Sequence, residues 1–103
     1  MTVLGFVTAK DEKEAEKIAT ALVENGLAAC CNIVPRVKSI YRWKNNVERA
    51  AEAMIMIKTK KGLVEKAVKK IKSLHSYEVP AIEFVDIAGG NPDSFAWIKD
   101  ETE

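Results

Sequence analysis

The chain has 103 residues, 48% hydrophobic and 30% charged, which is the composition of one ordinary globular domain. Its 16 basic and 15 acidic residues leave a net charge of +1 and form no basic stripe, which argues against nucleic acid and membrane surfaces as partners. The first residues lack the basic start and apolar core of a signal peptide, and the adjacent Cys30 and Cys31 are expected to be free thiols. We therefore expect a cytoplasmic protein with a single domain over residues 1–103.

The apolar pattern predicts the order strand, helix, strand, strand, helix, strand, followed by a short helix. This order is that of the split βαβ unit, so the sequence predicts a ferredoxin-like α+β fold. Asp11 and Glu14 resemble a capping box at the start of the first helix, and Gly26 is expected to end that helix in a left-handed conformation. Residues 100–103 are expected to fray. The expected ranges are a strand at 2–8, a helix at 11–25, a hairpin at 28–59, a helix with its apolar stripe from 64 to 71, a strand at 81–88 and a helix at 93–99.

The longest predicted feature is the hairpin. Its first arm runs from Ala28 to Trp43 and is rich in β-branched and aromatic residues. Asn45 and Asn46 are expected to form the turn, because asparagine tolerates positive φ better than most residues. Pro35 is expected to interrupt the first arm, since proline cannot donate a hydrogen bond to a neighbouring strand.

The length of the hairpin predicts an oligomer. Sixteen extended residues span roughly 50 Å at ~3.3 Å each, whereas the first helix is only about 23 Å long at ~1.5 Å per residue. Roughly half of the hairpin must therefore project beyond its own helices, which leaves apolar residues on bare strand edges. We expect these residues to contact other copies of the chain; they are Val37, Ile40, Tyr41, Trp43 and Val47.

Five separate segments carry a family resemblance. They are Leu27-Ala-Ala-Cys-Cys-Asn-Ile-Val-Pro35, Ser39-Ile-Tyr-Arg-Trp43, Glu52-Ala-Met-Ile-Met-Ile-Lys-Thr59, His75-Ser-Tyr-Glu-Val-Pro80 and Trp97-Ile98. In identity, spacing and order they resemble the CutA family of divalent-cation tolerance proteins over almost the whole chain. The resemblance implies a ferredoxin-like subunit in an intertwined homotrimer, and a role in tolerance to, or binding of, divalent metals such as copper.

The chain departs from the family where some members bind metal. One metal-binding pattern of the family has a cysteine at the end of the first strand and two consecutive histidines before the tyrosine; this chain has Val7 and Leu74-His75 there. His75 is the only histidine and remains the metal candidate, but a closed site typically needs about four ligands, and a turn histidine bonded to a backbone carbonyl is the competing interpretation. Cys30 and Cys31 could hold Cu(I), although we favour a role as small apolar side chains with one facing the core.

A second candidate site is a polar cleft between subunits. Glu52 and Lys58 are expected on one face of the second hairpin arm, and Tyr77 and Glu78 in the loop after the second helix. Together with His75 they predict a pocket for a small anionic ligand, and an interchain salt bridge is an equally open interpretation. The expected trimer interface residues are Ser39, Tyr41, Trp43 and Trp97.

The leading functional hypothesis is a trimeric, metal-responsive binding or signalling protein. An enzyme is disfavoured because the chain has no convincing nucleophile motif, no Gly-rich phosphate loop and no recognisable pair of carboxylates. The alternative is an allosteric sensor similar to PII-type signalling proteins, which would bind an anionic metabolite at subunit clefts. Acylphosphatase chemistry is disfavoured because Thr8–Asp11 lacks an arginine, and RNA recognition because Ala51–Thr59 has no aromatic residue.

Overall fold

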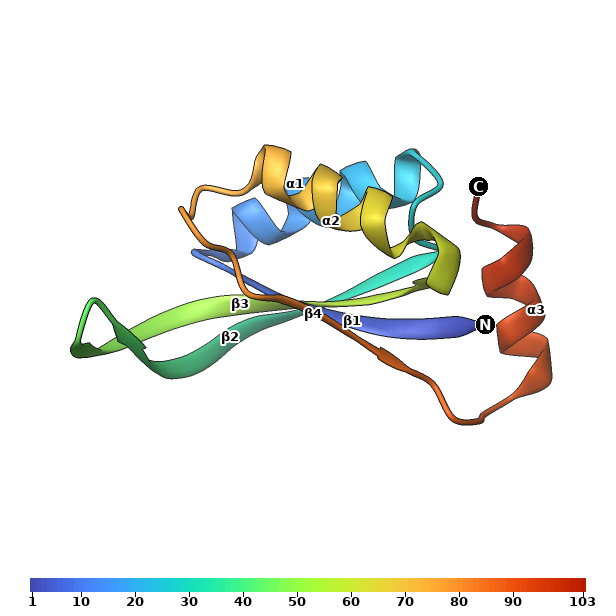
Figure 1. The fold of residues 1–103 in the computed structure, drawn as a ribbon. Coiled ribbons are helices and arrows are strands. Elements are labelled where there is room, and N and C mark those ends of the chain that lie inside the picture. Colours follow the sequence, from blue (N-terminus) through green and yellow to red (C-terminus); the bar gives the residue numbers. More distant parts are fainter.

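The computed structural model describes residues 1–103 and confirms the predicted ferredoxin-like α+β plan. The strands form one antiparallel sheet in the order β2-β3-β1-β4. Helices α1 and α2 cover one face of this sheet, and α3 lies at the end opposite the hairpin tip (Figure 1). None of the helices is long and apolar enough to span a membrane. The elements are β1 (Thr2–Ala9), α1 (Glu12–Glu24), β2 (Cys30–Trp43), β3 (Asn46–Lys60), a 3₁₀ turn η1 (Lys61–Leu63), α2 (Val64–Leu74), β4 (Ile82–Asp86) and α3 (Pro92–Asp100).

Local sequence signals set both ends of α1, as expected. The Asp11 side chain accepts a hydrogen bond from the backbone N–H of Glu14 at 2.8 Å and caps the first turn. Gly26 follows the helix with a φ of 69°, a left-handed conformation in which glycine has no Cβ to clash. The helix then faces the sheet with its buried apolar residues, which are Ala15, Ile18, Ala19 and Leu22.

The core lies between the two covering helices and the sheet. Residues of β1 alternate between buried and partly exposed, as expected for a strand with one covered face. Helix α2 contributes the buried Ala67 and Ile71. Thr59 is a polar member of this core, and its hydroxyl donates to the carbonyl oxygen of Leu27 at 2.7 Å, so the buried group is satisfied. The strands contribute Val3, Val7, Ala9, Ala53, Ile55, Ile57 and Thr59.

Strands β2 and β3 continue far beyond the rest of the sheet. β1 pairs with β3 only from Ala53 to Lys60, so the distal arms, Val37–Trp43 and Asn46–Glu52, form a two-stranded segment that we call the ribbon. The ribbon projects past α1 and α2, which confirms that part of the hairpin extends beyond its own helices (Figure 1). Its large exposed apolar residues are Ile40, Tyr41, Trp43 and Val47. A two-stranded hairpin is only marginally stable by itself in water.

The turn of the hairpin lies one residue earlier than predicted. Lys44 and Asn45 have φ values of 49° and 69°, and Asn46 already pairs with Trp43. A two-residue turn of this kind requires two consecutive positive φ angles, and here lysine takes the first of them. The prediction that Asn45 and Asn46 form the turn is therefore wrong.

The predicted interruption at Pro35 is confirmed. The register of β2 against β3 shifts between Val34 and Val37, which places one extra residue in β2. The shift falls beside the last pair between β1 and β3, that of Ala9 with Ala53. The bulge therefore marks the point at which the hairpin leaves its own sheet.

The last residues are held in place, so the prediction that they fray is wrong. The backbone N–H of Glu103 donates to the carbonyl of Gly26 at 2.8 Å, and Lys60 Nζ donates to the carbonyl of Glu103. The carboxylate of Glu103 pairs with Lys66, and this contact lowers the pKa of Glu103. These partners are distant in the chain, which is why no local pattern indicated them.

We predict that Thr59→Val lowers the free energy of unfolding by about 1–3 kcal/mol, because the carbonyl of Leu27 loses its buried donor while the packing volume is nearly kept. Thr59→Ser is the matched control, since it retains the hydroxyl, and it should lose less stability. Urea unfolding of the three proteins at one protein concentration, followed by circular dichroism, measures the difference. Equal midpoints for the wild type and Thr59→Val would contradict the role given to this hydrogen bond.

Candidate functional site

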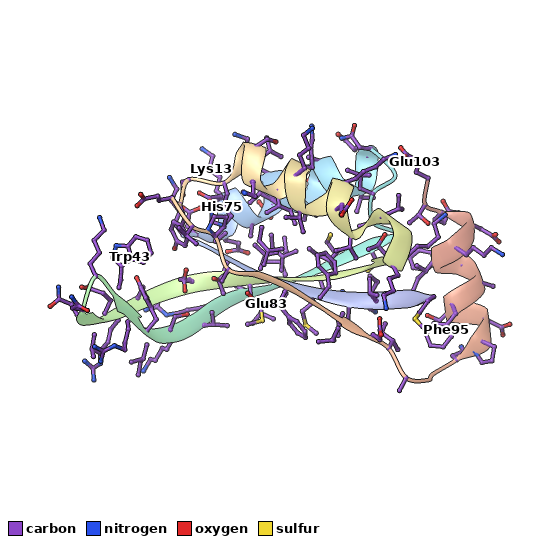
Figure 2. All side chains as sticks on the ribbon, in the orientation of Figure 1. Lys13, Trp43, His75, Glu83, Phe95 and Glu103 are labelled. Atoms are coloured by element: carbon purple, nitrogen blue, oxygen red, sulfur yellow. The ribbon has the colours of Figure 1, made fainter.

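A pocket of about 600 Å³ lies where the ribbon leaves the sheet. We call it the ribbon pocket; its walls come from the end of β1, the ribbon and the loop at residues 75–81, between α2 and β4. Trp43 projects from the ribbon on the side of the sheet that carries the helices (Figure 2). The lining residues are Thr8, Ser39, Tyr41, Trp43, Glu52, Ser76, Tyr77, Glu78, Val79 and Ala81. The structure therefore brings together three residues predicted for the cleft and three predicted for the trimer interface. The cleft residues are Glu52, Tyr77 and Glu78, and the interface residues are Ser39, Tyr41 and Trp43.

Tyr77 ties the loop to the ribbon. Its Oη donates a hydrogen bond to Oε2 of Glu52 at 2.6 Å. Burial of the phenol, and then this contact with Glu52, raises the pKa of Tyr77 well above its usual value of 10.0. The phenol therefore remains a hydrogen-bond donor at neutral pH, and it fixes one oxygen of the Glu52 carboxylate.

His75 has the structural role that competed with metal binding. Its Nε2 donates to the carbonyl of Thr8 at 2.8 Å, and its Nδ1 accepts from the backbone N–H of Tyr77 at 3.1 Å. The side chain is 0% exposed. Both ring nitrogens are thus engaged within the chain, and metal binding by His75 stays a prediction. The ring holds the loop against the end of β1, as Figure 2 shows by the position of His75 beneath the helices.

Glu14 of α1 completes this anchor of the loop. Its Oε1 accepts from the backbone N–H of Ser76 at 3.3 Å and lies 3.3 Å from Nδ1 of His75. The carboxylate is buried, and Lys10 Nζ lies 4.0 Å from its other oxygen. The sequence predicted Glu14 only as a helix-capping residue, because its loop partner Ser76 is 62 residues away in the chain. The loop is therefore positioned by α1 and β1 before it reaches Glu52.

Lys58 and Trp97 lie outside the ribbon pocket. Lys58 pairs with Leu4 and Cys30 near the other end of β3, roughly 20 Å from Glu52 at ~3.3 Å per residue. Lys58 and Glu52 of one chain therefore do not line the same pocket, and the predicted cleft between subunits stays a prediction. Trp97 is on α3, at the end of the sheet opposite the ribbon (Figure 1). The pocket lining consequently contains two carboxylates and no lysine or arginine.

The two cysteines are free and differ in environment. Cys31 packs against the core, whereas Cys30 Sγ lies 3.7 Å from Oδ1 of Asn32 on the exposed side. Burial, and then the neighbouring Cys30, raises the pKa of Cys31 to about 12. Cys31 is therefore a protonated, apolar side chain at neutral pH. No group of three or more His, Cys, Asp or Glu side chains in the chain is arranged to hold a metal ion.

Sequence reasoning missed part of the pocket wall. Thr8, Ser76, Val79 and Ala81 line it although none was predicted as a site residue. These side chains are small or apolar and carry no chemical signature. Ser76 and Val79 flank Tyr77 and Glu78 in the sequence, so the sequence could have indicated that the whole loop lines the pocket.

Comparison with known proteins agrees with this fold. The family profile of the CutA1 divalent ion tolerance protein matches residues 3–101. The chain belongs to the CutA1 family. The divalent-cation tolerance protein CutA of Thermus thermophilus is 42% identical over 97 residues, which are 94% of each chain. A solved structure of the divalent cation tolerance protein from Thermus thermophilus superposes with a TM-score of 0.97 at 40% identity and covers 100% of both chains.

Other members of the CutA1 family are longer or occur in other compartments. Mouse Protein CutA is 42% identical over 98 residues, which are 95% of this chain but 55% of the mouse protein. The chain thus spans about half the length of the mammalian relatives it matches. A relative in Arabidopsis thaliana is named chloroplastic, and a structure from Archaeoglobus fulgidus, with a TM-score of 0.97 and 34% identity over the full chains, is named periplasmic. Family membership alone therefore does not assign a compartment.

We predict that Cys31 is unreactive toward a disulfide reagent such as DTNB at mildly alkaline pH in folded Cys30→Ser protein. A pKa of about 12 leaves almost no thiolate, which is the reacting species. Unfolding in urea should release one reactive thiol per chain. Cys31→Ser is the matched variant that keeps Cys30, and rapid stoichiometric labelling of folded Cys30→Ser would contradict the raised pKa of Cys31.

We predict a stability loss at high pH that depends on Tyr77. Because the pKa of Tyr77 is raised on folding, its contribution is fully present below the unfolded-state value of about 10 and declines as pH rises above it. Urea midpoints measured from neutral pH to about pH 11 should fall less steeply in Tyr77→Phe than in the wild type. Identical slopes in the wild type and Tyr77→Phe would contradict the raised pKa of Tyr77.

Proposed function

We propose that this chain is a homotrimeric binding or signalling protein that takes part in tolerance to divalent cations, and that it is not an enzyme. Family membership supports the tolerance role, because relatives carry that name and their names state no catalytic activity. We place the protein in the cytoplasm because both cysteines are free, as is usual in a reducing compartment.

The ribbon is the observation that carries the oligomer. β2 is an edge strand of 14 residues, and its outer side has no neighbour in the sheet. The ribbon also exposes Ile40 by 66% and Val47 by 56%. Long, apolar strand edges tend to pair with other chains, and association of several copies would cover both the edge and these side chains. The number three comes from the resemblance to the family.

The residues of one chain do not fit a resident metal. His75 uses both ring nitrogens within the chain, the partly buried Cys31 is protonated, and no three potential ligands of the His, Cys, Asp and Glu types cluster. The proposed response to copper or another divalent cation therefore does not depend on a metal site inside a subunit.

The alternative of an anion sensor loses support from the ribbon pocket. An anionic ligand calls for a lysine, an arginine or a helix N-terminus in the wall. Lys58 was predicted to supply the positive charge, but within one chain it lies far from the ribbon pocket. The pocket wall instead contains Glu52 and Glu78.

We predict that light scattering gives the wild-type protein three times the chain mass of 11.4 kDa. Ile40→Lys should lower this mass toward that of one chain, because it adds a positive charge between Lys38 and Arg42 on a surface that the oligomer would bury. Val23→Lys is the matched control, since Val23 is 43% exposed on α1, away from the ribbon, and it should leave the mass unchanged. A wild-type mass of one chain would contradict the homotrimer.

Direct metal binding is tested on the same samples by calorimetric titration with Cu(II), and with Cu(I) under reductant. Copper binding that is present in the assembled protein and absent in single-chain Ile40→Lys would indicate ligands from more than one subunit. Equally strong binding by the single chain would contradict the absence of a metal centre within it.

A further inference from the structure

We propose that the ribbon pocket binds an organic cation, namely an ammonium or guanidinium group carried on a short apolar body. This proposal goes beyond the proposed function and shares with it only the ribbon, which forms part of the pocket wall. It has the opposite charge to the ligand predicted from the sequence, and the reasons lie in the side chains of the wall.

Glu52 supplies the negative charge at a partly desolvated position. Its residue is 7% exposed, and its Oε2 already accepts from Tyr77. The other oxygen, Oε1, has no hydrogen-bond partner in the chain. No fully buried side-chain oxygen or nitrogen lacks a partner, so Oε1 keeps some accessible surface. Because Glu52 lines the ribbon pocket, this free oxygen is available to a ligand there. Charge-assisted hydrogen bonds to N–H donors are the strongest that a carboxylate accepts.

Aromatic faces surround the same space. Tyr41, Trp43 and Tyr77 all line the pocket, and Tyr41 and Trp43 remain 45% and 38% exposed. Lys44 Nζ already lies 5.6 Å from the centroid of the Trp43 ring, which is within the range of a cation–π contact. The tryptophan thus attracts an ammonium group from its own chain, and a ligand cation would use the same chemistry.

The charge and size of the pocket fit a small organic cation. Glu78 adds a second carboxylate to the wall, and no lysine or arginine lines it to neutralise the pair. The volume of about 600 Å³ is that of a small-molecule site, which typically measures roughly 300–1,000 Å³. Val79, which is 66% exposed, offers an apolar surface to the body of the ligand.

The same chemistry has a second possible source, a basic side chain from another copy of the chain. The ribbon carries Lys38, Arg42 and Arg49, and these could reach the carboxylate of a neighbour in an oligomer. We infer a free small molecule because the carboxylate and the aromatic faces all come from one chain, so the pocket is built before assembly. The experiment separates the two sources.

The test uses agmatine as the probe, because it carries a guanidinium and an ammonium group on a four-carbon chain. In Trp97→Phe protein, Trp43 is the only tryptophan and reports on the pocket. We expect a saturable change in its fluorescence with agmatine, and none with the neutral 1,4-butanediol or the dianionic adipate. Glu52→Gln should weaken agmatine binding by about tenfold or more, because it removes the charge-assisted hydrogen bond. Lys44→Met should strengthen binding, since it removes the competing ammonium group.

Glu65→Gln, on the exposed side of α2, is the matched control and should bind agmatine like the parent protein. The absence of a saturable response to millimolar agmatine in folded protein, or equal affinity in Glu52→Gln and the parent, would overturn the proposal. A loss of mass in Glu52→Gln without any agmatine response would also overturn it, because the pocket would then hold a partner's basic side chain. Agmatine binding by a protein with the mass of one chain would support the cation site and contradict only the homotrimer.

Discussion

The unequal length of β1 and the β2–β3 hairpin is the constraint on which the rest of the structure depends. β1 has 8 residues, whereas β3 has 15, so the sheet loses a strand at Ala53 and the ribbon begins there. The bulge near Pro35, the exposed apolar side chains and the ribbon pocket all occur at or beyond this boundary. A longer β1 would have paired with β3 along the ribbon and left only the β2 edge bare. The features that suggest a function are therefore consequences of where one strand stops.

The boundary becomes a pocket only because the loop at residues 75–81 is held beside it. This loop has no strand or helix of its own, and its position comes from side chains: His75 binds the end of β1, and Glu14 binds the backbone of Ser76. Tyr77 then reaches the ribbon through Glu52. A single histidine in a chain that resembles metal-tolerance proteins suggests metal binding. In this structure His75 is buried and positions the loop that forms the pocket wall.

Much of the fold could be predicted because its signals are local or periodic. The apolar spacing of α1, the cap at Asp11 and the left-handed Gly26 depend on neighbouring residues, and each was found. The turn was misplaced because Lys44 adopts a positive φ, which is uncommon for lysine and was less conspicuous than two adjacent asparagines. Lys58 lies apart from Glu52 within one chain because alternation indicates the face of a strand and not the distance along it. The anchors made by Glu14 and Glu103 join distant parts of the chain, and a single sequence contains no signal for such pairs.

The small net charge of the chain does not reveal that acidic and basic side chains are separated on the ribbon, and this separation matters for assembly and binding. The net charge is +1, yet the ribbon pocket is lined by two carboxylates while a second hollow of the ribbon is lined by Arg36, Lys38 and Arg49. Surfaces of opposite sign on one chain favour head-to-tail contacts between copies, and such contacts form a ring when the rotation closes; a trimer is one such ring. A free cation and a neighbour's basic side chain would then compete for the Glu52 carboxylate. Ligand binding and assembly would be linked through that group, because each changes the affinity for the other by the same factor.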